Sequence, residues 1–133
     1  MFKSRYFELM PKKRKSDLKI CDELWSKLVK VRARFKCEYC WKTTSLNSHH
    51  IFSRTNYSTR FDLDNWICLC SGHHTLNSNF AAHKTPMEFS DRVKEYRWEE
   101  RYQALKEKKN KIRDKDYTKV KQYLLDETAK LTP

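Results

Sequence analysis

The sequence predicts an α+β chain that is mostly helical, with a short non-helical centre between helices at both ends. Apolar residues recur every three or four positions in residues 17–34 and again beyond residue 85, as they do on one face of a helix. Residues 35–70 lack this period and hold four of the five cysteines. One Gly and three Pro in 133 residues are too few for a turn-rich β sandwich.

Charge is distributed unevenly along a chain whose length suits a single domain. Lys and Arg total 29 against 17 Asp and Glu, a formal charge of +12. Residues 1–36 carry a net +8, residues 37–83 are neutral, and residues 84–133 carry a net +4. Two basic arms around a neutral centre favour a nucleic-acid partner, and a merely solvated surface is the alternative.

Several classes of protein are excluded by composition. No apolar run approaches the ~20 residues that span a bilayer, so we expect no membrane segment. The start, MFKSRYFELMPKKRK, lacks the apolar region of a secretory signal. An odd number of cysteines without such a signal favours a reducing, cytoplasmic location and metal ligation over disulfides.

The first part of the chain is expected to be a basic arm followed by a helix. Residues 1–16 form the flexible arm, which suits DNA contact or nuclear import and is centred on Lys12, Lys13, Arg14 and Lys15. Asp17 is the expected N-cap of a helix that extends to Arg34. Cys21 lies on its apolar stripe, so we interpret it as a core residue.

The centre is expected to contain two strands and a short helix. Ser45–Phe52 and Asn65–Leu69 read as strands, separated by a polar loop at residues 53–60 that carries two arginines. A short helix is expected over residues 71–80.

Beyond the centre, Thr85-Pro86-Met87-Glu88 is typical of a helix start. One or two helices should follow to about Lys109, and another should begin near Asp114 or Asp116. We therefore divide the chain into an arm (1–16), a main domain (17–110) and a C-terminal helical extension (111–133). The apolar stripe of that extension favours intramolecular packing over a homodimer contact.

The cysteines of the centre predict a structural zinc site. Cys37 and Cys40 form a C-x2-C pair, and Cys70 with His73 repeats the spacing. Cys68 is a rival ligand, because alternate residues of a strand share a face. We prefer Cys70 with His73 over Cys68, because matching x2 loops are the commoner architecture, and this choice leaves Cys68 in the core. The alternative to the whole site is four unrelated buried thiols and a surface histidine. Four protein ligands leave no open position, which is typical of a structural ion.

Histidines and an asparagine lie between and beside these pairs, in the order His49, His50, Asn65 and His74. This order, with His49-His50-Ile51 and the segment from Asp64 to His74, resembles the HNH nuclease family. Residues 17–110 further resemble the NinG/Rap-type branch of phage recombination nucleases. That finer resemblance depends on Cys21-Asp22-Glu23-Leu24-Trp25-Ser26, the HHIFSR stretch and HKTPMEF.

The resemblance implies a ββα-metal core at about residues 36–82, flanked by helices. It implies that His50 is the general base, with its other ring nitrogen bonded to a backbone carbonyl, and that Asn65 braces the loop. His49 and His74 would hold one divalent cation. Because strand residues alternate in direction, His49 and His50 can serve one site if the strand ends or bulges there.

Departures from the family pattern carry expectations of their own. His49 replaces a frequent Asp, and nitrogen ligands favour Mn²⁺ over Mg²⁺, with Ni²⁺, Co²⁺ or Zn²⁺ as alternatives. Asn77 could reach the metal or phosphate, whereas His83 is expected to pack. At two positions where the family often has small residues stand Trp41 and Trp66; we expect both to be buried, with base stacking as the alternative for an exposed ring.

The predicted function is metal-dependent DNA endonuclease, nicking duplex or cutting branched DNA in phage replication or recombination. Arg54 and Arg60 should grip phosphates near the scissile bond, and the basic arm should add salt-sensitive affinity. The alternatives are a non-catalytic zinc-binding DNA adaptor and an RNA-directed nuclease or RNA-binding zinc module. The resemblance implies a cytoplasmic location, in a bacterium or in a phage-infected host cell.

Overall fold

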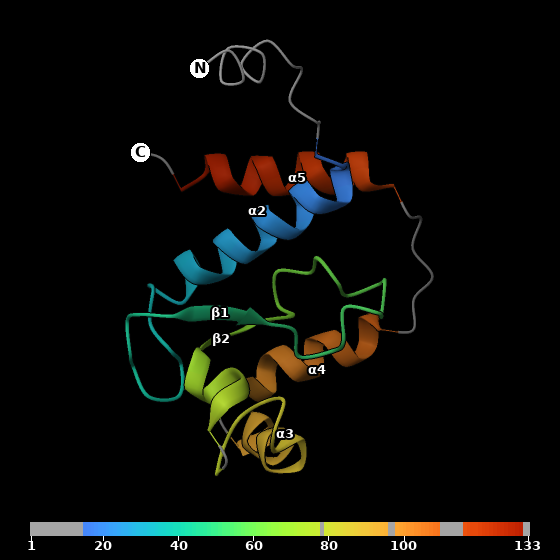
Figure 1. The fold of residues 1–133 in the computed structure, drawn as a ribbon. Coiled ribbons are helices and arrows are strands. Elements are labelled where there is room, and N and C mark those ends of the chain that lie inside the picture. Colours follow the sequence, from blue (N-terminus) through green and yellow to red (C-terminus); the bar gives the residue numbers. More distant parts are fainter. Residues whose placement is uncertain (1–14, 78, 96–97, 110–115, 132–133) are drawn as a thin grey trace, which may run out of the picture.

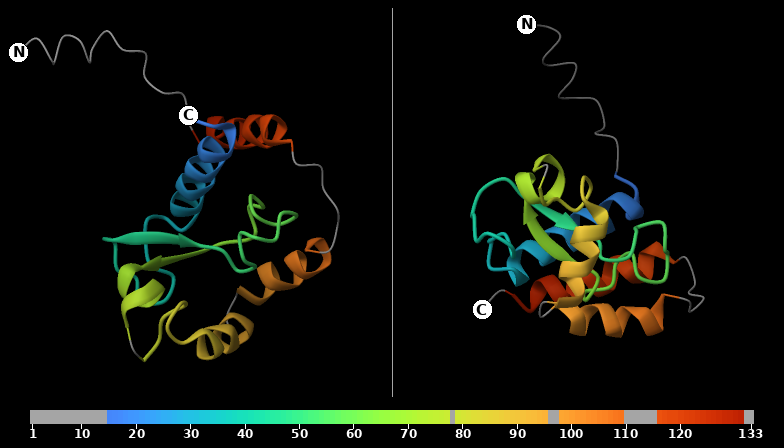
Figure 2. Two further views of the ribbon diagram at one scale, coloured as in Figure 1. Left: turned by 45° about the vertical axis from the view of Figure 1, so that its right-hand side comes forward. Right: turned by 90° about the horizontal axis from the view of Figure 1, so that it is seen from below.

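The computed structural model describes residues 15–77, 79–95, 98–109 and 116–131 (Figure 1). The elements in chain order are α2 (Asp17–Arg32), β1 (Leu46–His49), β2 (Ile67–Cys70), the turn η1 (Gly72–Leu76), α3 (Pro86–Glu95), α4 (Trp98–Lys108) and α5 (Tyr117–Ala129). Helices α2 and α5 lie on one side of the two-stranded sheet, and α3 and α4 lie on the other (Figures 1 and 2). This mostly helical arrangement is compatible with the predicted class. No helix in the described ranges is long and apolar enough to span a membrane.

Helix α2 begins one residue earlier than the predicted cap allows. Ser16, not Asp17, is the N-cap, and its hydroxyl accepts a hydrogen bond from the amide of Lys19 at 3.2 Å. Asp17 is then the first helical residue, where its negative charge suits the helix dipole.

The end of α2 is a Schellman turn built without glycine. The amide of Phe35 donates to Lys30 O and that of Arg34 to Val31 O, both at 2.9 Å. Arg34 and Phe35 both take left-handed backbone angles, with φ of 56° and 54°. The helix therefore stops at Arg32, two residues before the predicted end, because the last carbonyls bond backward rather than onward.

Strands β1 and β2 pair antiparallel, with Leu46 opposite Cys70 and His49 opposite Ile67. Both are shorter than predicted, because residues beyond the paired register bond to side chains and loops. Strand β1 ends at His49, as the two adjacent histidines require, so His50 leaves the sheet.

Strand β2 separates two hydrophobic clusters. One lies between the sheet, α2 and α5 and includes Cys21, Trp25, Cys68 and Leu124. The other joins the cysteine region to the segment before α3 and includes Cys37, Ile67, Leu69 and Phe80. Cys21 and Cys68 are fully buried in the first cluster, which confirms the prediction that both are core residues.

The two unusual tryptophans differ. Trp66 is buried as predicted, and its indole N–H donates to Leu63 O. Trp41 is 61% exposed, so the prediction of burial is wrong. The reason is local: the Trp41 amide donates to Cys37 O at 2.8 Å, and this tight turn presents residue 41 at the surface.

The C-terminal helices follow the predicted signals. Thr85 O accepts the Phe89 amide at the start of α3, while the Thr85 hydroxyl bonds to the backbone of Ala81. Asp116 caps α5 by accepting the amides of Thr118 and Lys119.

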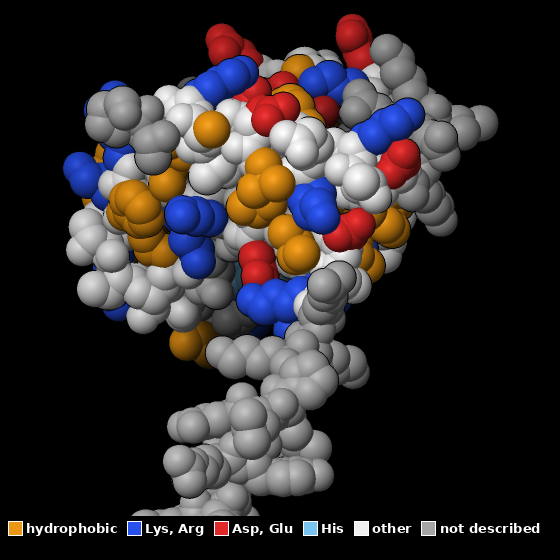
Figure 3. Space-filling view, turned by 90° about the horizontal axis from the view of Figure 1, so that it is seen from above, with side chains coloured by type: hydrophobic (Ala, Val, Ile, Leu, Met, Phe, Trp, Pro, Cys, Tyr) orange, Lys and Arg blue, Asp and Glu red, His pale blue; other side chains and the backbone are white. Residues whose placement is uncertain are grey.

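Helix α5 uses its apolar stripe within the chain. Leu124 is fully buried against α2, with Tyr117 and Val120 packed around the same cluster. On the face seen from above the α5 side, hydrophobic side chains are interspersed with acidic, basic and other polar ones (Figure 3). Helix α5 is thus packed onto α2.

Candidate active site

The structure brings together the four residues predicted to hold zinc. The ligand atoms of Cys37, Cys40, Cys70 and His73 all lie within 4.8 Å of one another. The two sulfurs of Cys40 and Cys70 are 3.7 Å apart, and His73 Nδ1 is 3.2 Å from Cys70 Sγ and 3.9 Å from Cys37 Sγ. Tetrahedral zinc with bonds of about 2.3 Å separates two sulfurs by roughly 3.8 Å. These residues therefore fit the ion, and we name this group the cysteine knuckle.

The thiols of the knuckle differ in how readily they ionise. Burial alone raises the pKa of Cys70, but hydrogen bonds from the amides of His73 and Gly72 and from neighbouring thiols lower it below its ordinary value. Desolvation raises the pKa of Cys40 to about 11. Burial also raises the pKa of Cys68 to about 11, as expected for a thiol in an apolar core.

Helix α4 supports the knuckle from outside. Glu38 accepts the Cys68 amide at 3.0 Å and forms an ion pair of 2.8 Å with Arg101. The guanidinium of Arg101 also lies 3.8 Å from the ring centroid of Trp66. Because this ion pair is mostly buried and fully hydrogen-bonded, it fixes the knuckle relative to α4.

The turn η1 directs two adjacent histidines to different places. It is a wide turn closed by a hydrogen bond of 2.7 Å from the Asn77 amide to Gly72 O, shorter than the helix predicted over residues 71–80. His73 belongs to the knuckle, where its Nδ1 lies near Cys70 Sγ, whereas His74 Nε2 lies 3.1 Å from His83 Nε2. Asn77, which the sequence allowed to reach the metal or phosphate, instead uses its side-chain oxygen to accept the amides of Asn79 and Phe80.

A second cluster consists of His49, His74 and His83, whose ligand atoms also lie within 4.8 Å of one another. We call it the histidine cluster. Two of its members were predicted as cation ligands, but His83 was expected to pack elsewhere. The position of His83 depends on backbone pairing: the Ala82 amide donates to His73 O, and the His83 amide donates to His74 O. No local spacing signals such a contact.

The histidine cluster suits a divalent cation. Burial, followed by the proximity of His74 and His83, lowers the pKa of His49 to about 3. Burial also lowers the pKa of His74. The neutral imidazoles of His49 and His74 keep a lone pair available for a metal, and the ring nitrogen of His83 lies beside them, so the cluster fits a cation with nitrogen preference.

His50 lies beside this cluster with its ring fixed on two sides. Its Nε2 is 3.0 Å from Arg60 O, the backbone carbonyl contact predicted for it. A neutral ring that donates there keeps Nδ1 as its acceptor. The ring is also stacked on Trp25, with centroids 3.9 Å apart and planes inclined by 6°. Burial lowers the pKa of His50 to about 4, even though the Arg60 carbonyl favours the protonated ring.

Asn65 braces the loop that follows His50. Its side chain is fully buried and accepts the Phe52 amide at 2.8 Å. Its NH₂ group donates to Phe52 O at 3.0 Å and to Thr59 O at 2.9 Å. These contacts join both ends of the 52–59 segment, as the bracing prediction requires.

The histidine cluster and His50 share one cleft of about 620 Å³. It is lined by Ser48, His49, His50, Ile51, Ser53, Arg54, His74 and His83. Arg54 therefore lies where a phosphate ligand was predicted. Arg60 does not lie there: its guanidinium makes a bidentate ion pair with Asp22, with Nη2 2.9 Å from Oδ2 and Nε 3.3 Å from Oδ1. Lys15 pairs with Glu23 at 3.0 Å, while Lys12, Lys13 and Arg14 lie outside the described residues.

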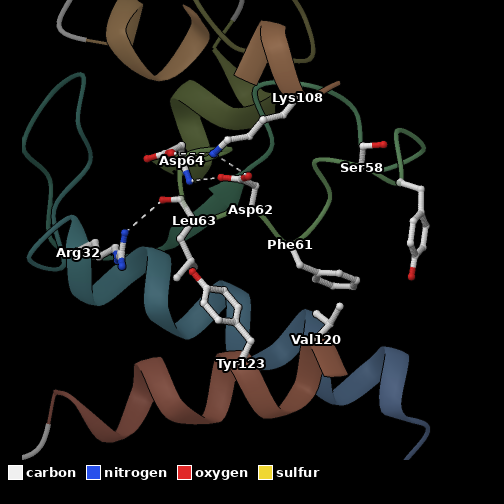
Figure 4. Close-up of a pocket in the computed structure, with 10 residues that line it drawn as sticks. Arg32, Ser58, Phe61, Asp62, Leu63, Asp64, Lys108, Val120 and Tyr123 are labelled. Carbon is white, nitrogen blue, oxygen red and sulfur yellow. Dashed lines mark hydrogen bonds and ion pairs between the residues drawn. The ribbon is translucent and has the colours of Figure 1, made fainter. Parts of the chain in front are cut away.

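A hollow of about 380 Å³ between α2, α5 and the 57–64 loop is of a different kind (Figure 4). Lys108 extends between Asp62 and Asp64, with ion pairs of 3.1 and 3.4 Å. Arg32 donates to Leu63 O on its other side. Because Lys108 and the two aspartates neutralise one another locally, we interpret the hollow as a structural contact between elements.

Comparison with protein families gives one match that bears on both clusters. Residues 37–80 match the family model described as HNH endonuclease. The matched segment contains the knuckle, His49, His50, Asn65 and His74, but neither Trp25 nor His83. Comparison with curated proteins and with solved structures gives no match. The HNH match supports nuclease chemistry on nucleic acid, and the finer NinG/Rap-type resemblance has no relative behind it.

Proposed function

We propose that this chain is a metal-dependent endonuclease that hydrolyses DNA phosphodiester bonds in the histidine-lined cleft. The observation that carries the proposal is the position of His50. A neutral imidazole with one nitrogen bonded to Arg60 O shares a cleft with three further histidines that fit a cation. A base beside a cation site is the arrangement that phosphodiester hydrolysis needs.

In this proposal His49, His74 and His83 hold the catalytic cation, and Cys37, Cys40, Cys70 and His73 hold a structural Zn²⁺. The catalytic cation, when bound, supplies positive charge that stabilises the phosphate and its leaving oxygen. Three neutral nitrogen ligands favour Mn²⁺, Co²⁺, Ni²⁺ or Zn²⁺ over Mg²⁺. The nuclease domain would span about residues 17–110, with its zinc-stapled core at about 36–82.

The proton is handled by His50. Its Nδ1 accepts a proton from the attacking water, and the resulting imidazolium is stabilised where the ring already makes contact. The Nε2–H bond to Arg60 O strengthens when the ring is charged. The face of Trp25 adds a cation–π contribution. Asn65 holds the segment that presents His50, and Arg54 binds a phosphate oxygen.

The net charge of +12 supports a polyanionic substrate. One cleft per chain cuts one strand, so a single chain nicks, and cutting both strands takes two chains or two events. The resemblance of the sequence to phage recombination nucleases favours branched DNA as a substrate and a cytoplasmic role in replication or recombination.

A nicking assay tests the proposal. Supercoiled plasmid is incubated with zinc-loaded protein and added Mn²⁺, and wild type is compared with His50→Ala and with Gln103→Ala, an exposed α4 control. We expect wild type and Gln103→Ala to nick, and His50→Ala to lose at least about 10²-fold in rate while binding DNA equally well. A non-catalytic adaptor would show no His50-dependent nicking, and an RNA-directed nuclease would cut RNA in preference to the plasmid.

A further inference from the structure

The knuckle turn that begins at Cys37 ends in an exposed aromatic ring, Trp41, that folding does not explain. Trp41 has a φ of 68°, in the left-handed region that favours glycine, and its side chain is 61% exposed. A bulky residue in this conformation is strained, and an exposed indole gains little from burial. The position thus carries a large apolar ring at a cost to stability.

Positive charge surrounds this ring. A hollow of about 450 Å³ is lined by Trp41 together with Arg32, Arg34, Lys36 and Arg101. Lys36 Nζ lies 5.9 Å from the Trp41 ring centroid. Arg101 is paired with Glu38 at 2.8 Å and Arg32 with Glu127 at 3.7 Å, so the positive charge offered to a ligand comes from Arg34 and Lys36. We call this surface the Trp41 platform.

An exposed indole face among cations matches the chemistry of an unpaired nucleotide. In duplex DNA the faces of the bases are covered by their neighbours, whereas an unpaired base can stack on an aromatic side chain while its phosphates meet Lys or Arg. We propose that the Trp41 platform binds an unpaired base of the DNA substrate, with Arg34 and Lys36 at the adjoining phosphates. The proposal rests on the proposed function, and it specifies DNA with an unpaired segment as the preferred substrate class.

The knuckle and the cleft lie at opposite ends of the paired strands. The knuckle meets the sheet where Cys70 pairs with Leu46, and the cleft begins where His49 pairs with Ile67. Three residues of a strand span about 10 Å. A few nucleotides cover that distance, since successive nucleotides of one strand rise about 3.4 Å each in a duplex.

The test compares affinity for paired and unpaired DNA. Fluorescence anisotropy measures Kd for a labelled duplex and for the same duplex with a single-stranded gap, using zinc-loaded protein. The variants are Trp41→Gly, Trp41→Phe and Tyr123→Ala, the last being an exposed aromatic on α5 that serves as the matched control. Glycine suits the left-handed backbone, so Trp41→Gly should melt at a higher temperature than wild type.

We expect Trp41→Gly to weaken binding of the gapped duplex by about tenfold and to change binding of the paired duplex by less than about twofold. Trp41→Phe keeps an aromatic face, so it should retain most of the wild-type affinity for the gapped duplex. Tyr123→Ala should match wild type on both. Equal affinity of Trp41→Gly and wild type for gapped DNA would overturn the platform, and so would an equal loss on both substrates. Because this readout is binding, a failure of plasmid nicking would refute the nuclease and leave the platform standing.

Discussion

At the scale of single residues, His50 shows how a site depends on groups outside its motif. The ring is bonded to Arg60 O and lies flat on Trp25, which comes from α2. The indole N–H of Trp25 in turn donates to Asp62 O at 3.2 Å. Trp25 therefore links the N-terminal helix, the 60–62 segment and the proposed base, and we regard it as a positioning residue.

Substituting Trp25 separates its two contacts. Trp25→Phe keeps an aromatic face for His50 and loses the bond to Asp62 O, so we expect stability to fall by about 1 kcal/mol and nicking to persist. Trp25→Leu removes the face as well, and we expect the single-turnover nicking rate to fall by about tenfold with Kd for DNA unchanged. Wild-type rates for a folded Trp25→Leu protein would show that the stack plays no part in positioning.

At the scale of elements, β2 and η1 place two cysteines and two histidines within seven residues and direct them to three different surroundings. Cys68 enters the core, Cys70 and His73 face the knuckle, and His74 faces the cleft. Alternation alone would place Cys68 and Cys70 on one face of the strand, but β2 ends at Cys70, where the chain turns into η1. The turn of η1 likewise separates the two histidines.

This assignment predicts different zinc contents for two neighbouring cysteine variants. Cys70→Ser removes a ligand, so the purified protein should lose its structural zinc and melt at a much lower temperature. Cys68→Ala removes a core thiol, so the zinc should remain at one per chain. Metal analysis of both proteins checks this, and loss of zinc from Cys68→Ala alone would reverse the choice of ligand.

The packing of α5 on α2 offers a second test, with adjacent leucines. Leu124 is fully buried, and Leu125 is 41% exposed. Leu124→Ala should lower the free energy of unfolding by roughly 2–5 kcal/mol, because it leaves a cavity between the helices. Leu125→Ala should change it by less than about 0.5 kcal/mol. Urea denaturation measures both, and similar losses would mean that α5 is not seated as described.

At the scale of the whole molecule, features set by local sequence were predictable and those set by long-range contacts were not. The spacing of Cys37, Cys40, Cys70 and His73 is enough to predict which side chains meet. The approach of His83 to His74 depends on backbone pairing across nine residues, and the Arg60–Asp22 ion pair joins a loop to α2. Trp41 is exposed because of a turn with a left-handed backbone angle, and amino-acid composition does not reveal that angle.

We propose that two adjacent histidines serve different cations: His73 the structural zinc, and His74 the ion in the cleft. Electron paramagnetic resonance of Mn²⁺ added to zinc-loaded protein tests this most directly, because bound Mn²⁺ loses the signal of the free ion. We predict that wild type binds one Mn²⁺ per chain, and that His74→Ala binds it at least about tenfold more weakly with its zinc retained. Mn²⁺ binding by His74→Ala that equals wild type, or no binding by wild type, would contradict the account.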